Sequence, residues 1–142
     1  MTTGRFFTAT VAGGVTLFVV GFLLWGLLAT DFYEAHVGTA TGVTKEPMEW
    51  AYLVLGQLFW AALLAHVIGT WAKVSGFGPG LKIGLVFGIL VSFAIGLTQY
   101  SMSNLMDLSG TLVDPLLTGV WAGLGGGVIG LVLGCCQSEP AG

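Results

Sequence analysis

The chain has 142 residues, of which 55% are hydrophobic and 8% are charged, and its formal net charge is −3. A soluble domain carries about a quarter charged residues, so this composition excludes an ordinary soluble globular domain. Nucleic-acid binding is also excluded, because the four lysines and arginines form no basic patch. The mean hydropathy of +0.92 is typical of a chain that lies in a lipid bilayer.

The charged residues divide the chain into four long uncharged runs, at 6–30, 50–72, 83–106 and 115–138. Each run exceeds the roughly 18 residues that mark a transmembrane helix. None has the charged stripe of a soluble amphipathic helix, and the first run is too long for the core of a signal peptide. We therefore expect one all-α membrane domain, a bundle of four transmembrane helices at about 8–30, 48–72, 81–106 and 114–135.

Basic residues are distributed unevenly between the two sides of this arrangement. Arg5, Lys73 and Lys82 fall on one side, and Lys45 is alone on the other. Because cytoplasmic loops carry an excess of Lys and Arg, we expect both termini in the cytoplasm. The opposite, outer side carries six acidic residues and is electronegative.

The connection after the first helix, 31–49, collects side chains that could bind a metal ion. Carboxylates and an imidazole can bind a divalent cation, and here they are Asp31, Glu34, His36, Glu46 and Glu49, with Asp107 and Asp114 expected on the same side. Their spacing matches no defined metal site. It favours the simpler interpretation, in which these are solvated helix ends.

The second helix, 48–72, holds the two most polar groups of any span, Gln57 and His66, and we expect the other three helices to pack around it. His66 is a candidate haem or pigment ligand, or a proton-handling group. Haem bound by two histidines of one chain is excluded, because His36 lies outside the bilayer. The simpler interpretation is a histidine hydrogen-bonded to a neighbouring hydroxyl or carbonyl group.

The polar residues of the spans predict two layers inside the bundle. Gln57 and Gln99 each lie eight residues from an outer acid, Glu49 and Asp107, which at 1.5 Å per residue is about 12 Å. We expect these two amides to be buried and to share hydrogen bonds. By the same measure Thr16, Ser92 and His66 form a second layer nearer the cytoplasm.

Glycines are regularly spaced on the last two helices. The third helix has Gly80, Gly84 and Gly88, and the fourth has Gly119, Gly123, Gly126, Gly130 and Gly134. Small residues allow helices to approach closely in lipid, so we expect these faces to mediate helix packing. Four helices cannot bury every glycine face, which favours a further contact with another protomer or protein.

The two outer loops carry a resemblance to known proteins. The segments 38–43 (GTATGV), 45–48 (KEPM) and 104–114 (NLMDLSGTLVD) resemble small bacterial four-helix inner-membrane proteins of unknown function. The resemblance covers nearly the whole chain. It implies the fold and a bacterial inner membrane, and it implies no activity.

No motif of an enzyme is present: there is no phosphate-binding loop, metalloprotease helix or nucleophile elbow. The uncharged runs contain no Asp, Glu, Lys or Arg, whereas pumps usually keep an ionisable group at membrane depth. We therefore expect a non-enzymatic structural or accessory subunit, which packs with itself or with a larger membrane complex. The alternatives are a small conduit or carrier for a cation or small neutral solute, and, more weakly, a haem- or pigment-binding subunit that uses His66.

Overall fold

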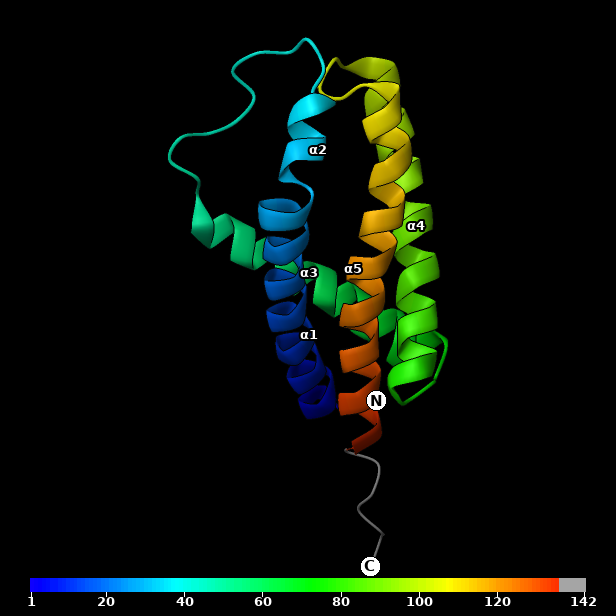
Figure 1. The fold of residues 1–142 in the computed structure, drawn as a ribbon. Helices are drawn as coiled ribbons and strands as arrows, with labels where there is room; N and C mark the ends of the chain where they lie inside the picture. Colours follow the sequence, from blue (N-terminus) through cyan, green and yellow to red (C-terminus); the bar gives the residue numbers. More distant parts are fainter. Residues whose placement is uncertain (136–142) are drawn as a thin grey trace, which may run out of the picture.

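The computed structural model describes residues 1–135 and is all-helical in this range, apart from loops and one isolated bridge between Val37 and Met106. Two of the long segments end in a π-helical turn, and the short helix α2 follows the first (Figure 1). The elements are α1 (Thr3–Leu23), η1 (Leu24–Leu28), α2 (Thr30–Ala35), α3 (Trp50–His66), η2 (Val67–Trp71), α4 (Phe77–Met102) and α5 (Leu108–Cys135). Four helical segments are long and apolar enough to cross a membrane, which confirms the prediction from the uncharged runs.

Both ends of the described chain, Met1 and Cys135, lie at one end of the molecule (Figure 1). We call this the terminal end; it also holds the 72–76 connection. The opposite, loop end holds α2 and the connection between α4 and α5.

The last helix begins six residues earlier than the expected start at 114. The carboxylate of Asp107 accepts a hydrogen bond from the backbone N–H of Gly110 at 2.8 Å, so Asp107 satisfies the first turn in the way a helix cap does. Pro115 therefore lies inside α5 and not at its first position. This shift places Asp114 within a helix that is long and apolar enough to cross a membrane.

The third helix also begins early, at Phe77 and not at 81. Gly76 precedes it with a φ of +95°, a conformation that only glycine adopts easily. Pro79 lies in the first turn, where its missing N–H has no helical partner to lose. The glycine- and proline-rich segment therefore starts the helix as well as breaking the preceding one.

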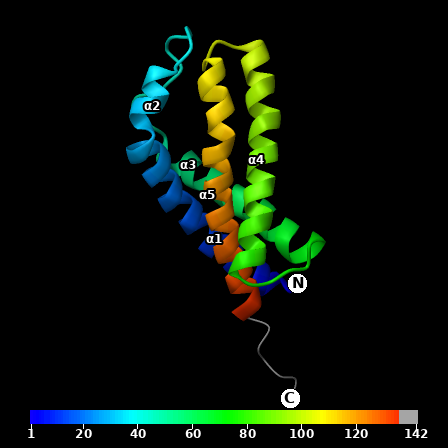
Figure 2. The same cartoon turned by 45° about the vertical axis from the view of Figure 1, so that its right-hand side comes forward.

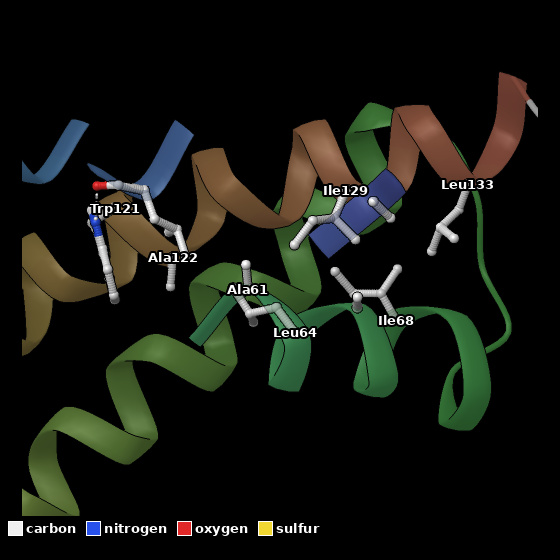
Figure 3. Packing of buried hydrophobic residues seen from close by; sticks show 10 residues of the cluster. Ala61, Leu64, Ile68, Trp121, Ala122, Ile129 and Leu133 are labelled. Carbon is white, nitrogen blue, oxygen red and sulfur yellow. Dashed lines mark hydrogen bonds between the residues drawn. The ribbon is translucent and has the colours of Figure 1, made fainter. Parts of the chain in front are cut away.

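The central helix of the bundle is α5, and not the 48–72 helix that we expected at the centre. α5 has fourteen buried residues, whereas α3 and η2 together have five. In both overall views α5 stands between α1 and α4, and α3 crosses behind them obliquely (Figures 1 and 2). The apolar core forms where α3 crosses α5: Leu64 and Ile68 point towards Ile129 and Leu133 (Figure 3).

α4 and α5 pack through their glycines. A Cβ atom on Gly126 would lie 2.5 Å from the carbonyl oxygen of Gly80 and 3.1 Å from the Cα of Gly84. A Cβ atom on Gly80 or Gly84 would likewise overlap a backbone carbonyl of α5. Gly134 is at the edge of this contact, because its added Cβ would meet only ordinary neighbours at 3.4 Å or more. The two glycine faces therefore cover each other within one chain.

Candidate functional site

A carboxylate surrounded by hydroxyl groups lies between α2, α4 and α5. The phenol of Tyr33 donates a hydrogen bond to Oδ1 of Asp114 at 2.6 Å. The hydroxyl of Ser92 donates to Oδ2 at 2.7 Å, and that of Thr118 donates to the same oxygen at 3.3 Å. Asp114 is part-buried and Ser92 is 8% exposed, so three elements converge on one carboxyl group.

The π-helical turn η1 positions the tyrosine of this cluster. Trp25, within η1, donates its indole N–H to the phenol oxygen of Tyr33 at 3.0 Å. The hydroxyl of Thr30 donates to the carbonyl oxygen of Trp25 at 3.1 Å, which satisfies a group that the helix ending leaves without a partner. Single π turns are often found at functional sites. Here the turn joins α1 to α2 and brings Trp25 beside the ring of Trp121, with 5.8 Å between centroids.

Tyr33 acts as a hydrogen-bond donor over the whole physiological pH range. Its burial, and the hydrogen bond to Asp114, raise the pKa of the phenol above the ordinary value of 10.0. The indole of Trp25 opposes this effect weakly, since it donates to the phenol oxygen. The phenol therefore stays neutral and continues to donate its hydrogen bond to Asp114.

Asp114 has no positively charged partner in the described part of the chain. The single ion pair among residues 1–135 joins Lys45 to Glu49 at 3.1 Å, on the exposed loop. Arg5 lies at the terminal end, where its guanidinium donates to the carbonyl oxygen of Leu133. A charge in a membrane-spanning helix is costly unless it is compensated, and the partners of Asp114 are all neutral hydroxyls.

A cavity of about 200 Å³ opens beside this carboxylate, between α4 and α5 near the loop end. Asp114 is the only charged residue among those that line it; the others are Gly96, Gln99, Tyr100, Ser103, Leu105, Met106 and Thr111. A larger, mostly apolar cavity of about 420 Å³ lies between α1 and α3, where Trp25, Trp121 and Gln57 line it. Asp114 does not line this second cavity.

The five expected metal ligands do not come together. Within the described residues, no three His, Cys, Asp or Glu side chains lie close enough to hold a metal ion. The ring Nδ1 of His36 lies 2.8 Å from the carbonyl oxygen of Phe32, and Glu49 pairs with Lys45. Asp31 and Glu34 lie on α2 and Glu46 lies on the long loop, and all three are exposed.

The predicted polar layers are not formed. Gln99 is exposed, and Gln57 is part-buried, with no hydrogen-bond partner for its Oε1 atom among residues 1–135. His66 is exposed on the outer face of α3, with the Trp71 ring edge-to-face against it at 5.4 Å between centroids. Thr16 donates to the carbonyl oxygen of Ala12 in its own helix. The layers assumed parallel helices, and because α3 crosses obliquely, equal counts of residues do not give equal depths.

Ser92 is buried, as expected, but its partner Asp114 was assigned to the outer loop by sequence. One signal could have corrected this assignment. Thr111, Asp114, Thr118 and Trp121 recur at spacings of three and four residues, which places them on one helical face. That face is the one α5 turns towards Tyr33 and Ser92.

The described chain is all-helical, with four helices long and apolar enough to span a membrane, and the carboxyl group of Asp114 lies within one of them. Comparison with known proteins adds no closer assignment, since no family model, curated protein or solved structure matches the chain.

Proposed function

We propose that this protein is a small, non-enzymatic membrane carrier or conduit that binds a monovalent cation at Asp114. The observation that supports this proposal is a carboxylate with no counter-charge, within a membrane-spanning helix and at the wall of a cavity. Ionisable groups inside spans usually mark ion or substrate pathways. This is a change from the sequence-based preference for an accessory subunit, because that preference assumed spans without ionisable groups.

The chemistry of the cluster suits an alkali cation or ammonium. Hard cations prefer oxygen ligands, and Asp114, Ser92 and Thr118 present carboxylate and hydroxyl oxygens from two helices. A hydroxyl can rotate its proton away and offer a lone pair to a cation. One carboxylate balances one positive charge, which favours a monovalent ion over a divalent one.

The direction of access follows from the proposed orientation in a bacterial inner membrane. With Arg5, Lys73 and Lys82 on the cytoplasmic side, both termini are cytoplasmic and the cavity beside Asp114 opens towards the outer side. Below Asp114, Trp121 is 5% exposed and packs against the rings of Trp25 and Trp60. Passage to the cytoplasmic side would then require these aromatic rings to move.

Ion flux into liposomes tests this proposal. Purified protein in liposomes should transport at least one of Na⁺, K⁺ or NH₄⁺, and Asp114→Asn should abolish the flux. Asp31→Asn is the matched control, because it removes one exposed acidic charge at the same end of the molecule. Equal flux in the wild-type protein and Asp114→Asn, or no flux of any of these ions, would exclude the carrier.

A second candidate function is the accessory subunit predicted from sequence, and the outer face of α3 favours it. One stripe of this face is exposed along its length: Tyr52, Gly56, Phe59, Leu63 and His66. The alternating spacing of four and three residues matches a left-handed helix pair. A Cβ atom on Gly56 would meet nothing within 4 Å, and His66 is a polar group that a partner helix in lipid could satisfy.

Assembly through this stripe is tested separately from ion flux. The prediction is that the wild-type protein migrates as an oligomer, or with a membrane-protein partner, in native gels of mild detergent extracts. Gly56→Leu should release a monomer, since a Cβ atom added at Gly56 would meet nothing within 4 Å in this chain. A monomeric wild-type protein without a partner would leave the α3 stripe as a lipid-facing surface.

A further inference from the structure

A basic cavity of about 290 Å³ lies at the terminal end of the bundle, whereas the cavity beside Asp114 lies near the loop end. α1, η2 and α5 form its walls, and Arg5, Thr70 and Lys73 supply its polar groups. None of the residues that line it within the described chain is acidic. The cavity therefore concentrates positive charge and hydrogen-bond donors at one membrane boundary.

Arg5 is held in this cavity with an unused donor. Its Nη2 atom donates to the carbonyl oxygen of Leu133, near the end of α5, where a cation is favoured by the helix dipole. Its Nε atom is buried and has no hydrogen-bond partner among the described residues. A buried donor without a partner is costly, so the guanidinium would gain by turning towards an acceptor in the cavity.

Lys73 supplies the second charge. It lies two residues after the end of η2 and adopts a positive φ of 52°, a conformation that is uncommon for a residue with a side chain. This turn reverses the chain between η2 and α4, and Lys73 lies on the cavity wall together with Thr70. A guanidinium, an ammonium and a hydroxyl thus face one space.

We propose that this cavity binds a phosphate group, the phosphodiester of an anionic lipid headgroup. Guanidinium groups bind phosphate oxygens through paired N–H donors, and Lys binds phosphate as a point charge. Basic pockets between transmembrane helices at the cytoplasmic boundary bind anionic lipid headgroups. The apolar residues beside Arg5, among them Met1 and Leu133, would meet the glycerol and the start of the acyl chains.

Lipid retention measured by native mass spectrometry tests the proposal. The probes are phosphatidylglycerol, phosphatidylcholine and inorganic phosphate, each added to the purified full-length protein in detergent. The wild-type protein should retain phosphatidylglycerol in preference to phosphatidylcholine, whose own ammonium group neutralises its phosphate. Lys73→Gln should lower this retention about fivefold, as expected for one basic residue near an anionic lipid.

Lys82→Gln is the matched control, because Lys82 is exposed, falls on the same side and does not line the cavity. It should leave retention unchanged. Arg5→Lys keeps the positive charge but removes the Nε donor. It should weaken lipid retention while disturbing the protein less than Arg5→Gln. If millimolar inorganic phosphate displaces the lipid, the cavity binds phosphate, but its ligand is free phosphate and not a lipid headgroup. Equal loss in Lys73→Gln and Lys82→Gln, or no preference for phosphatidylglycerol and no effect of phosphate, would overturn the proposal.

Discussion

The contact between α4 and α5 can be tested by adding a single methyl group. Gly126→Ala places a Cβ atom 2.5 Å from the carbonyl oxygen of Gly80, where an ordinary contact needs about 3.4 Å or more. The obstacle is backbone on a facing helix, so the helices must separate by nearly 1 Å. Overpacking of this kind costs about 1–3 kcal/mol, less the roughly 1 kcal/mol that alanine gains over glycine in a helix.

Gly56→Ala is the matched control for this prediction. Gly56 also lies inside a helix, α3, but its added Cβ would meet nothing within 4 Å. The same substitution should therefore stabilise the monomer by about 0.5–1 kcal/mol. The sign of the effect, and not only its size, should differ between the two sites.

Unfolding of the purified protein in mixed detergent, followed by circular dichroism, measures both variants. Gly126→Ala should unfold at a lower denaturant fraction than the wild-type protein, and Gly126→Leu should fail to fold or assemble. If the two alanine variants shift the midpoint in the same direction, the glycine contact does not stabilise this fold.

Three further predictions concern the phenol, the histidine and the orientation. Because the pKa of Tyr33 is raised in the folded state, its stabilising contribution is complete below about pH 10, the ordinary tyrosine value, and is lost as the pH rises towards the higher pKa. Tyr33→Phe should therefore lose less stability than the wild-type protein between pH 9 and pH 11. Parallel stability profiles of the two proteins over this range would contradict the prediction. His66 is exposed and packs on Trp71, so His66→Gln should leave the fold and the visible absorption spectrum unchanged; a visible band that disappears in the variant would instead assign His66 to a haem or pigment. In a background without Cys135 and Cys136, an impermeant thiol reagent on intact cells should label Thr41→Cys and not Ser75→Cys, and the reverse result would invert the proposed topology.

Some features of this fold follow directly from the order of residues. The charges at Lys45–Glu49, Lys73–Lys82 and Asp107–Asp114 separate the four apolar segments, and each segment became one long helical element. The spacing of Gly80, Gly84 and Gly88 indicated a close helix contact, which α4 makes with α5. Both inferences depend on a local pattern, of charge or of glycine spacing, which can be found in one segment by itself.

The arrangement of the helices could not be predicted in the same way. Periodicity does not specify the angle at which two helices cross, so nothing in 50–72 indicated the oblique path of α3. That angle removes His66 and Gln57 from the layers predicted for them. The start of α5 depended on a choice between two aspartates, Asp107 and Asp114, each a good cap by type, and the hydrogen bond to Gly110 decides it.

The candidate site was missed because its parts are far apart in the sequence. Asp114 was interpreted as an acid of the outer side, and its partner Tyr33 lies 81 residues away in the sequence. Their contact depends on the π-helical turn η1, which redirects the chain between Leu24 and Leu28. Such a turn has no simple sequence signature.

Stabilisation of the purified protein by cations tests the central claim most directly. At constant ionic strength, balanced with N-methylglucamine chloride, increasing NaCl, KCl or NH₄Cl should raise the melting temperature with saturation for at least one ion. A ligand at 100 times its dissociation constant stabilises by about 2.7 kcal/mol, which is easily measured. The account predicts that Asp114→Asn abolishes this increase and that Asp31→Asn retains it. A melting temperature that no cation raises, or one raised equally in Asp114→Asn, would contradict cation binding at Asp114.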